Sequence, residues 1–179
     1  ANHHGTSPEN AVMDLLRDTP HEIFALYFDM EPQNVCLVAE QPWVSFCSDA
    51  ESLSTEAARA RGGIHPRAFG AFAKVLGGLV RDERILSLPE AIRRMTSMPA
   101  DSLGISRRGR LRPGHYADIA VFSPDGVAAH ATPDQPEIYA SGMRHVLVNG
   151  IAVVLDGEHT GAIPGRFIRG PGWRGSGDP

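Results

Sequence analysis

Two short and almost entirely apolar runs place the strongest constraint on how this chain can fold. Residues 22–28 read Glu-Ile-Phe-Ala-Leu-Tyr-Phe, and residues 43–47 read Trp-Val-Ser-Phe-Cys. Runs of this length and composition are typical of strands that are buried on both faces, as in parallel sheets. Helix signals alternate with them: residues 7–9 (Ser-Pro-Glu) open one helix, and residues 31–32 (Glu-Pro) open another. The order helix, strand, helix, strand predicts an α/β fold.

Composition excludes several classes of protein. The chain has 179 residues, 21 acidic against 17 basic side chains and two cysteines. The lack of a basic excess argues against a nucleic-acid partner, and two cysteines do not make a disulfide-dense scaffold. We find no apolar run of roughly 18 residues and no signal-peptide core, so we expect no membrane partner and a cytoplasmic location. Because the chain begins at Ala1 without methionine, we also expect it to be a piece of a longer protein.

The rest of the chain divides into a loop, a helical part and a β part. Residues 51–63 are small, polar and charged, which indicates a lid, a binding loop or a disordered loop. Amphipathic spacing then predicts helices over 69–80, from Ser87 onward and over 96–104. After residue 107 the pattern changes: 117–122 is an expected strand, and Asn149-Gly150 between apolar runs predicts a β-hairpin.

Asp49 is the first candidate for chemistry. It follows the second apolar run directly, and the carboxyl ends of parallel strands are where α/β proteins place their active sites. A carboxylate there could bind a metal ion, accept a proton from metal-bound water, or do both. The alternative is an aspartate that caps a turn. Cys47 would lie on the same side of an extended strand as Asp49.

His65 and Arg67 form the second candidate. They flank Pro66, which makes a stiff corner at the end of the 51–63 loop. A guanidinium at such a corner can bind a carboxylate in bidentate fashion. The alternative is a surface turn that leads into the next helix.

These motifs resemble a known family. The sequences Ser-Asp-Ala at 48–50 and His-Pro-Arg at 65–67, with Gly-Arg-Leu-Arg-Pro-Gly at 109–114, Ala-Asp-Ile at 117–119 and Val-Asn-Gly at 148–150, occur in this order. Together they resemble the C-terminal portion of the N-acyl-D-amino-acid deacylases (D-aminoacylases) of the amidohydrolase superfamily.

The resemblance implies a fold and an activity. It implies the last two strands and helices of a metal-dependent-hydrolase (β/α)8 barrel over 1–106, part of the small amidohydrolase β-domain over 107–169, and a tail over 170–179. Asp49 matches the aspartate that moves protons and touches a metal. Arg67, with His65 beside it, matches the arginine that grips the α-carboxylate of the N-acyl-D-amino acid substrate. The implied cofactor is zinc, as one or two divalent metals.

The resemblance also leaves a gap. The family's His-x-His pair and its other metal ligands would lie upstream, in a missing N-terminal part of the same enzyme, so we expect the fragment alone to hold no zinc and to be inactive. Two alternatives remain: a non-catalytic association module that forms homo-oligomers through exposed barrel strands, and a cyclic-amide amidohydrolase of the dihydropyrimidinase type.

Overall fold

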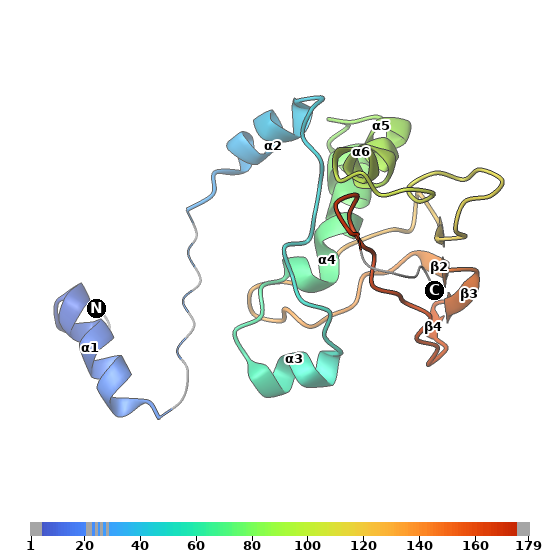
Figure 1. The fold of residues 1–179 in the computed structure, drawn as a ribbon. Coiled ribbons are helices and arrows are strands. Elements are labelled where there is room, and N and C mark those ends of the chain that lie inside the picture. The colour runs from blue at the N-terminus through green and yellow to red at the C-terminus, as the bar shows by residue number, and fades with distance from the viewer. Residues whose placement is uncertain (1–4, 21–22, 24, 26, 28, 175–179) are drawn as a thin grey trace.

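The computed structural model describes residues 5–20, 23, 25, 27 and 29–174. Figure 1 shows helices through the first part of the chain and a small sheet toward its end. The helices and strands are α1 (Pro8–Asp18), α2 (Pro32–Glu40), α3 (Thr55–Arg61), α4 (Arg67–Lys74), the π-helix η2 (Val75–Asp82), α5 (Leu88–Met95), α6 (Ser97–Ser102), β1 (Ile119–Phe122), β2 (Met143–Val148), β3 (Ile151–Leu155) and β4 (Glu158–His159).

The capped helices lie where the sequence predicts them. The hydroxyl of Ser7 accepts a hydrogen bond from the backbone N–H of Asn10 at the start of α1, and Ser87 caps α5 in the same way. Proline occupies the first turn of α1, α2 and α5, where its missing N–H costs no hydrogen bond.

The strand prediction for 43–47 is wrong. Residues 43–50 form no strand, and of the other expected strand only Ile23, Ala25 and Tyr27 are described, again without strand structure; its remaining residues lie outside the described part of the chain. A strand requires a hydrogen-bonded neighbour, and the described residues between 29 and 118 contain none. Instead, the N–H of Phe46 donates to the carbonyl of Arg94 on α5, at 3.3 Å. The segment is therefore attached to a helix.

The four strands form one antiparallel sheet in the order β1-β2-β3-β4. The predicted hairpin is confirmed: β2 and β3 pair across Asn149 and Gly150, whose φ angles of 51° and 82° suit a tight turn of the left-handed type. Together with the helices, this sheet confirms a mixed α/β fold, although the sheet is antiparallel.

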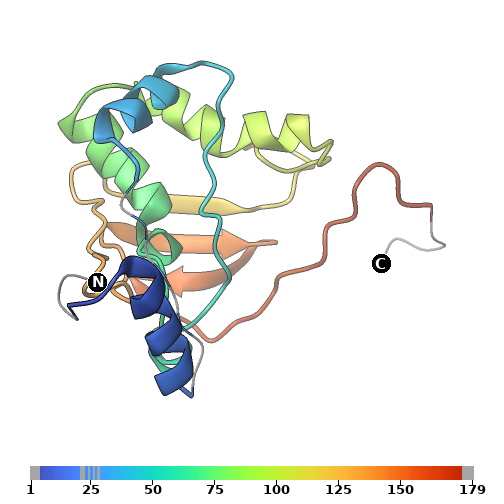
Figure 2. The ribbon, with the colours of Figure 1, turned by 90° about the vertical axis from the view of Figure 1, so that its left-hand side faces the viewer.

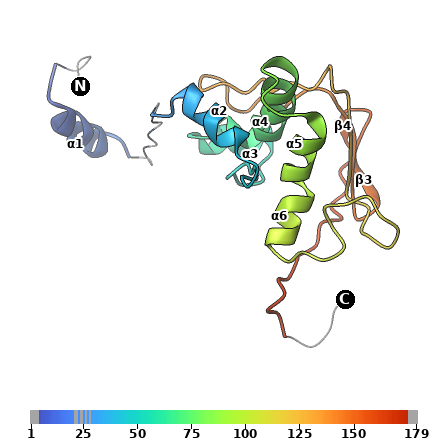
Figure 3. The same ribbon diagram turned by 90° about the horizontal axis from the view of Figure 1, so that it is seen from above.

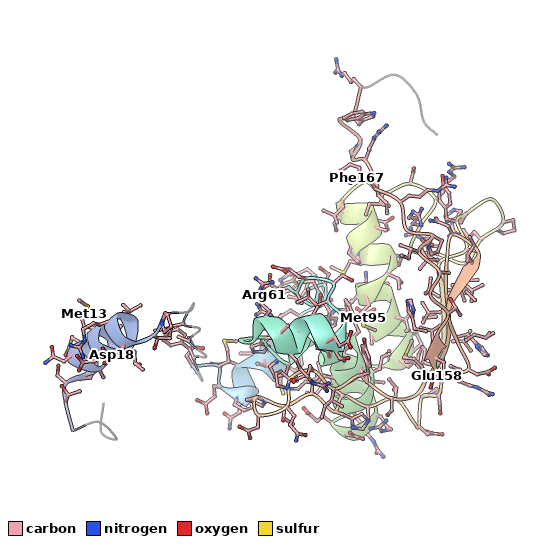
Figure 4. The ribbon with its side chains drawn as sticks, turned by 90° about the horizontal axis from the view of Figure 1, so that it is seen from below. Met13, Asp18, Arg61, Met95, Glu158 and Phe167 are labelled. Carbon is pink, nitrogen blue, oxygen red and sulfur yellow. The ribbon has the colours of Figure 1, made fainter. Side chains whose placement is uncertain are left out.

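The core lies on both sides of a central helical layer. Val75 and Leu79 of η2 pack with Ala39 of α2, whereas Leu76 of η2 packs with Val127 beside the sheet. Met95 of α5 contacts both groups, and Figures 2 and 4 show the helices lying against the sheet. The helical layer thus connects the 43–50 segment on one side with the sheet on the other.

Helix α1 stands apart from this core in Figures 1 and 3. Several of its apolar side chains are exposed, including Val12 and Leu16, and so are Leu37 and Val38 of α2. Within the described part of the chain, no helix is long and apolar enough to cross a bilayer.

Candidate active site

Asp49 lies at the end of the extended segment that leaves α2. Arginines of α5 hold the start of that segment: Arg93 donates to the carbonyl of Pro42 at 3.1 Å, and Arg94 donates to the carbonyl of Val44 at 2.5 Å. Asp49 itself has a φ of 47°, in the left-handed region that aspartate tolerates better than most residues. Its side chain is 77% exposed, so the carboxylate is open to a ligand.

The predicted corner at His65, Pro66 and Arg67 begins helix α4. The backbone N–H of Arg67 donates to Nδ1 of His65 at 3.1 Å. Burial, followed by the positive charges of Arg67 and Lys74, lowers the pKa of the His65 imidazole. A neutral imidazole has a single N–H. Because Nδ1 of His65 accepts a hydrogen bond, that proton is on Nε2. His65 therefore orients the start of α4, from which the Arg67 side chain projects.

The structure brings all three predicted residues to one cavity. Nη2 of Arg67 lies 2.8 Å from Oδ2 of Asp49, and His65 lines the same cavity of about 200 Å³. Arg67 and His65 also line a neighbouring cavity of about 400 Å³, where Ala129, Ala131 and Pro133 form part of the wall. The Arg67 guanidinium is 46% exposed, so this ion pair is accessible to solvent and to a competing carboxylate.

Two further charged residues line the first cavity, and the sequence analysis missed both. Glu51 accepts a short hydrogen bond from Arg61, the last residue of α3. The 51–63 segment is thus not a structureless loop. Its helix signals were present: Ser54 caps the N-terminus by accepting from the N–H of Ala57 at 3.1 Å, and Gly62 follows the C-terminus.

The described residues by themselves do not fit a zinc site. Catalytic zinc usually has three protein ligands, whereas no three His, Cys, Asp or Glu side chains come together among the described residues. Cys47 is exposed and is not part of the cavity wall. Asp49 as a metal ligand therefore stays a prediction.

Comparisons with known proteins place the chain in a family. Residues 59–154 match the model described as "Amidohydrolase family". The N-acyl-D-glutamate deacylase of Alcaligenes xylosoxydans xylosoxydans is 38% identical over 145 residues, or 81% of this chain and 28% of that protein.

Two solved structures agree with this match. A D-aminoacylase structure superposes with a TM-score of 0.68 at 35% identity, covering 76% of this chain and 27% of that one. The N-acyl-D-glutamate deacylase of Bordetella bronchiseptica, complexed with zinc and a phosphonate inhibitor, gives a TM-score of 0.65 at 39% identity, covering 71% and 25%. The chain thus spans about a quarter of the length of these relatives. Because the family model covers more than half of its residues, the chain belongs to the amidohydrolase family.

Proposed function

We propose that this chain supplies the proton-transfer and carboxylate-binding residues of an enzyme that hydrolyses N-acyl-D-amino acids. The observation that carries the proposal is the pairing of Arg67 with Asp49 at 2.8 Å in one open cavity, beside His65. The deacylases with which the chain aligns act on substrates that combine an amide bond with a free α-carboxylate. The cavity offers one group suited to each.

In this proposal Arg67 binds the α-carboxylate of the substrate. The incoming carboxylate replaces Asp49 as the partner of the guanidinium, which is a bidentate donor. Asp49 is then free to take a proton from the water that attacks the amide carbonyl. As the C–N bond breaks, Asp49 returns that proton to the departing amine, and the water oxygen remains in the new carboxylate. The products are a carboxylate and a D-amino acid.

The role of the metal is proposed from the relatives. Zinc is present in the Bordetella bronchiseptica enzyme, where it would act as a Lewis acid on the amide. We propose that its other ligands come from a part of the enzyme outside this chain, and that the chain alone is inactive. We also propose that residues 1–106 complete a barrel in the whole enzyme, where strands of the missing part would supply the neighbours that residues 43–47 lack here, and that the domain boundaries lie at 107–169 and 170–179.

Substitutions in the complete enzyme test the two roles. We expect Asp49→Asn to lower kcat by about 10²- to 10⁴-fold, because it removes the proton acceptor. We expect Arg67→Ala mainly to raise KM, by about tenfold or more, because it removes substrate binding. The assay compares N-acetyl-D-amino acids with their L-enantiomers and with dihydrouracil, a cyclic amide. Unchanged kinetics in both variants would contradict the assignments, and turnover by the 179 residues alone would contradict the proposed inactivity.

A further inference from the structure

The wall of the cavity holds a second arginine, and the ion pair that this arginine forms is exposed to solvent. Arg61 and its partner Glu51 both line the cavity that holds Arg67 and Asp49. Their side chains are 45% and 66% exposed. Figure 4 labels Arg61 beside helix α3. Ion pairs between side chains this exposed are weak and exchange their partners readily.

Helix α3 has contacts of its own besides the Glu51–Arg61 pair. Arg59 of the same helix donates to Glu137 at 3.2 Å, and Glu137 is only 22% exposed. Ser54 caps the helix at its other end. Neither Arg59 nor Glu137 lines the cavity. The two arginines of α3 therefore face different surroundings: one connects α3 to the loop after Val127, and the other lies on the wall of the candidate active site.

The pair of Arg61 with Glu51 repeats the arrangement of Arg67 with Asp49. In each pair an exposed carboxylate of the protein occupies an arginine that could bind a carboxylate of a ligand, and both arginines line a space of about 200 Å³. Because both arginines are on the wall of one cavity, a small molecule with two carboxylates that binds there has a guanidinium available for each. Glu51 can turn into solvent when it is displaced.

We propose that Arg61 determines specificity by binding the side-chain carboxylate of an acidic N-acyl-D-amino acid, with Glu51 as its resting partner. This inference rests on the proposed function, because Arg67 is taken to hold the α-carboxylate. Binding exchanges one ion pair for another: the substrate carboxylate accepts from Nη1 of Arg61, which donates to Glu51 in the resting state. A substrate with a neutral side chain leaves the Glu51–Arg61 pair intact and gains nothing from Arg61.

The test is an NMR titration of the isotope-labelled 179-residue chain with N-acetyl-D-glutamate and with N-acetyl-D-glutamine, which has the same shape but no second charge. We expect the glutamate derivative to bind about two- to fivefold more tightly, as one exposed ion pair provides. Arg61→Gln should abolish this preference without weakening the binding of the glutamine derivative. Arg61→Lys should restore part of it.

Two further variants separate specificity from structure. Glu51→Gln removes the competing carboxylate, so binding of N-acetyl-D-glutamate should strengthen; if the Glu51–Arg61 pair served only to hold the segment in place, binding would weaken instead. Glu56→Gln removes a charge from an exposed position of the same helix, outside the cavity, and should leave the preference unchanged.

The outcomes distinguish this inference from the proposed function. Equal affinities for the two derivatives, or an equal loss of both in Arg61→Gln, would overturn the role of Arg61 and leave Arg67 as the clamp. Two results would contradict the proposed function and, with it, the inference. One is that neither derivative shifts the NMR resonances of the cavity residues. The other is that Arg67→Gln changes the affinity for neither derivative.

Discussion

Arg94 is the largest side chain among those that the fold buries completely. Its guanidinium donates to the carbonyls of Val44, at 2.5 Å, and Ala39, at 2.6 Å, and lies 4.6 Å from the centre of the Phe46 ring. Desolvation lowers the pKa of this arginine from its ordinary value. A buried cation is tolerated only where acceptors surround it. Arg94 thus links α5 to the end of α2 and to the segment that leads to Asp49.

Removing this guanidinium should destabilise the protein. We expect Arg94→Met to lower the free energy of unfolding by about 2–5 kcal/mol, because one buried and one partly buried carbonyl lose their donors while most of the side-chain volume remains. Urea denaturation followed by circular dichroism measures the change. The control is Arg93→Met, which loses an exposed ion pair with Glu90 and one exposed hydrogen bond to the carbonyl of Pro42, and which should cost less than about 1 kcal/mol. An equal loss of unfolding free energy in the two variants would show that the buried position of Arg94 adds nothing to its contribution.

The residues of the candidate site differ in how far the sequence revealed them. Asp49 was predicted because it follows an apolar run, and His65 and Arg67 because they flank the corner at Pro66; the family resemblance supplied their roles. Glu51 and Arg61 were missed because their meaning depends on α3, which folds the segment back so that both reach the cavity of Asp49. Arg94 was not predictable in this way, since its side chain is held by carbonyls that lie 50 and 55 residues away in sequence.

At the scale of elements, helix η2 depends on a close approach between two backbones. A Cβ atom at Gly77 would lie 2.6 Å from the carbonyl oxygen of Val127, which also accepts a hydrogen bond from Arg81 at 2.6 Å. The absence of a side chain at this position lets the helix contact the loop beside the sheet. Next to it, a Cβ atom at Gly78 would meet only the flexible side chains of Lys74, at 3.7 Å, and Glu83, at 4.0 Å.

This difference predicts opposite effects for the same substitution at adjacent residues. Gly77→Ala should destabilise the protein by about 1–3 kcal/mol, because the new methyl group forces the backbones apart. Gly78→Ala should be neutral or stabilise the protein by up to about 1 kcal/mol, because alanine loses less conformational entropy than glycine in a helix. Thermal unfolding monitored by calorimetry measures both. If Gly77→Ala unfolds at the same temperature as the parent chain, the close contact between Gly77 and the carbonyl of Val127 does not require glycine.

The elements that the sequence predicted are those with local determinants. A serine cap and a proline in the first turn specify α1 and α5, and Asn149-Gly150 specifies the hairpin. The run at 43–47 was misassigned because an apolar composition indicates burial but not what covers it. Here the cover includes α5, to which a side chain and a backbone carbonyl attach the segment.

At the scale of the whole molecule, the exposed apolar faces of α1 and α2 remain to be explained. Val12 and Leu16 lie one turn apart on α1 and are 55% and 59% exposed, and Leu37 and Val38 of α2 are exposed as well. Exposed apolar side chains that gather on one helix indicate a site of association. Because residues 43–50 form no strand, these helix faces offer a second route, besides the barrel strands, to the association that we expected.

We expect the 179-residue chain to self-associate through α1, in a way that sedimentation velocity detects as a rise in the sedimentation coefficient with concentration. The double substitution Val12→Glu and Leu16→Glu should return the chain to a monomer at every concentration, because burying the new carboxylates in an apolar contact is costly. Asn10→Glu adds the same kind of charge to an exposed position of α1 and should leave the association intact. A parent chain that sediments as a monomer throughout would contradict the prediction. In the complete enzyme we expect the remaining part of the protein to cover these faces, so the same double substitution should there reduce stability instead of changing the state of association.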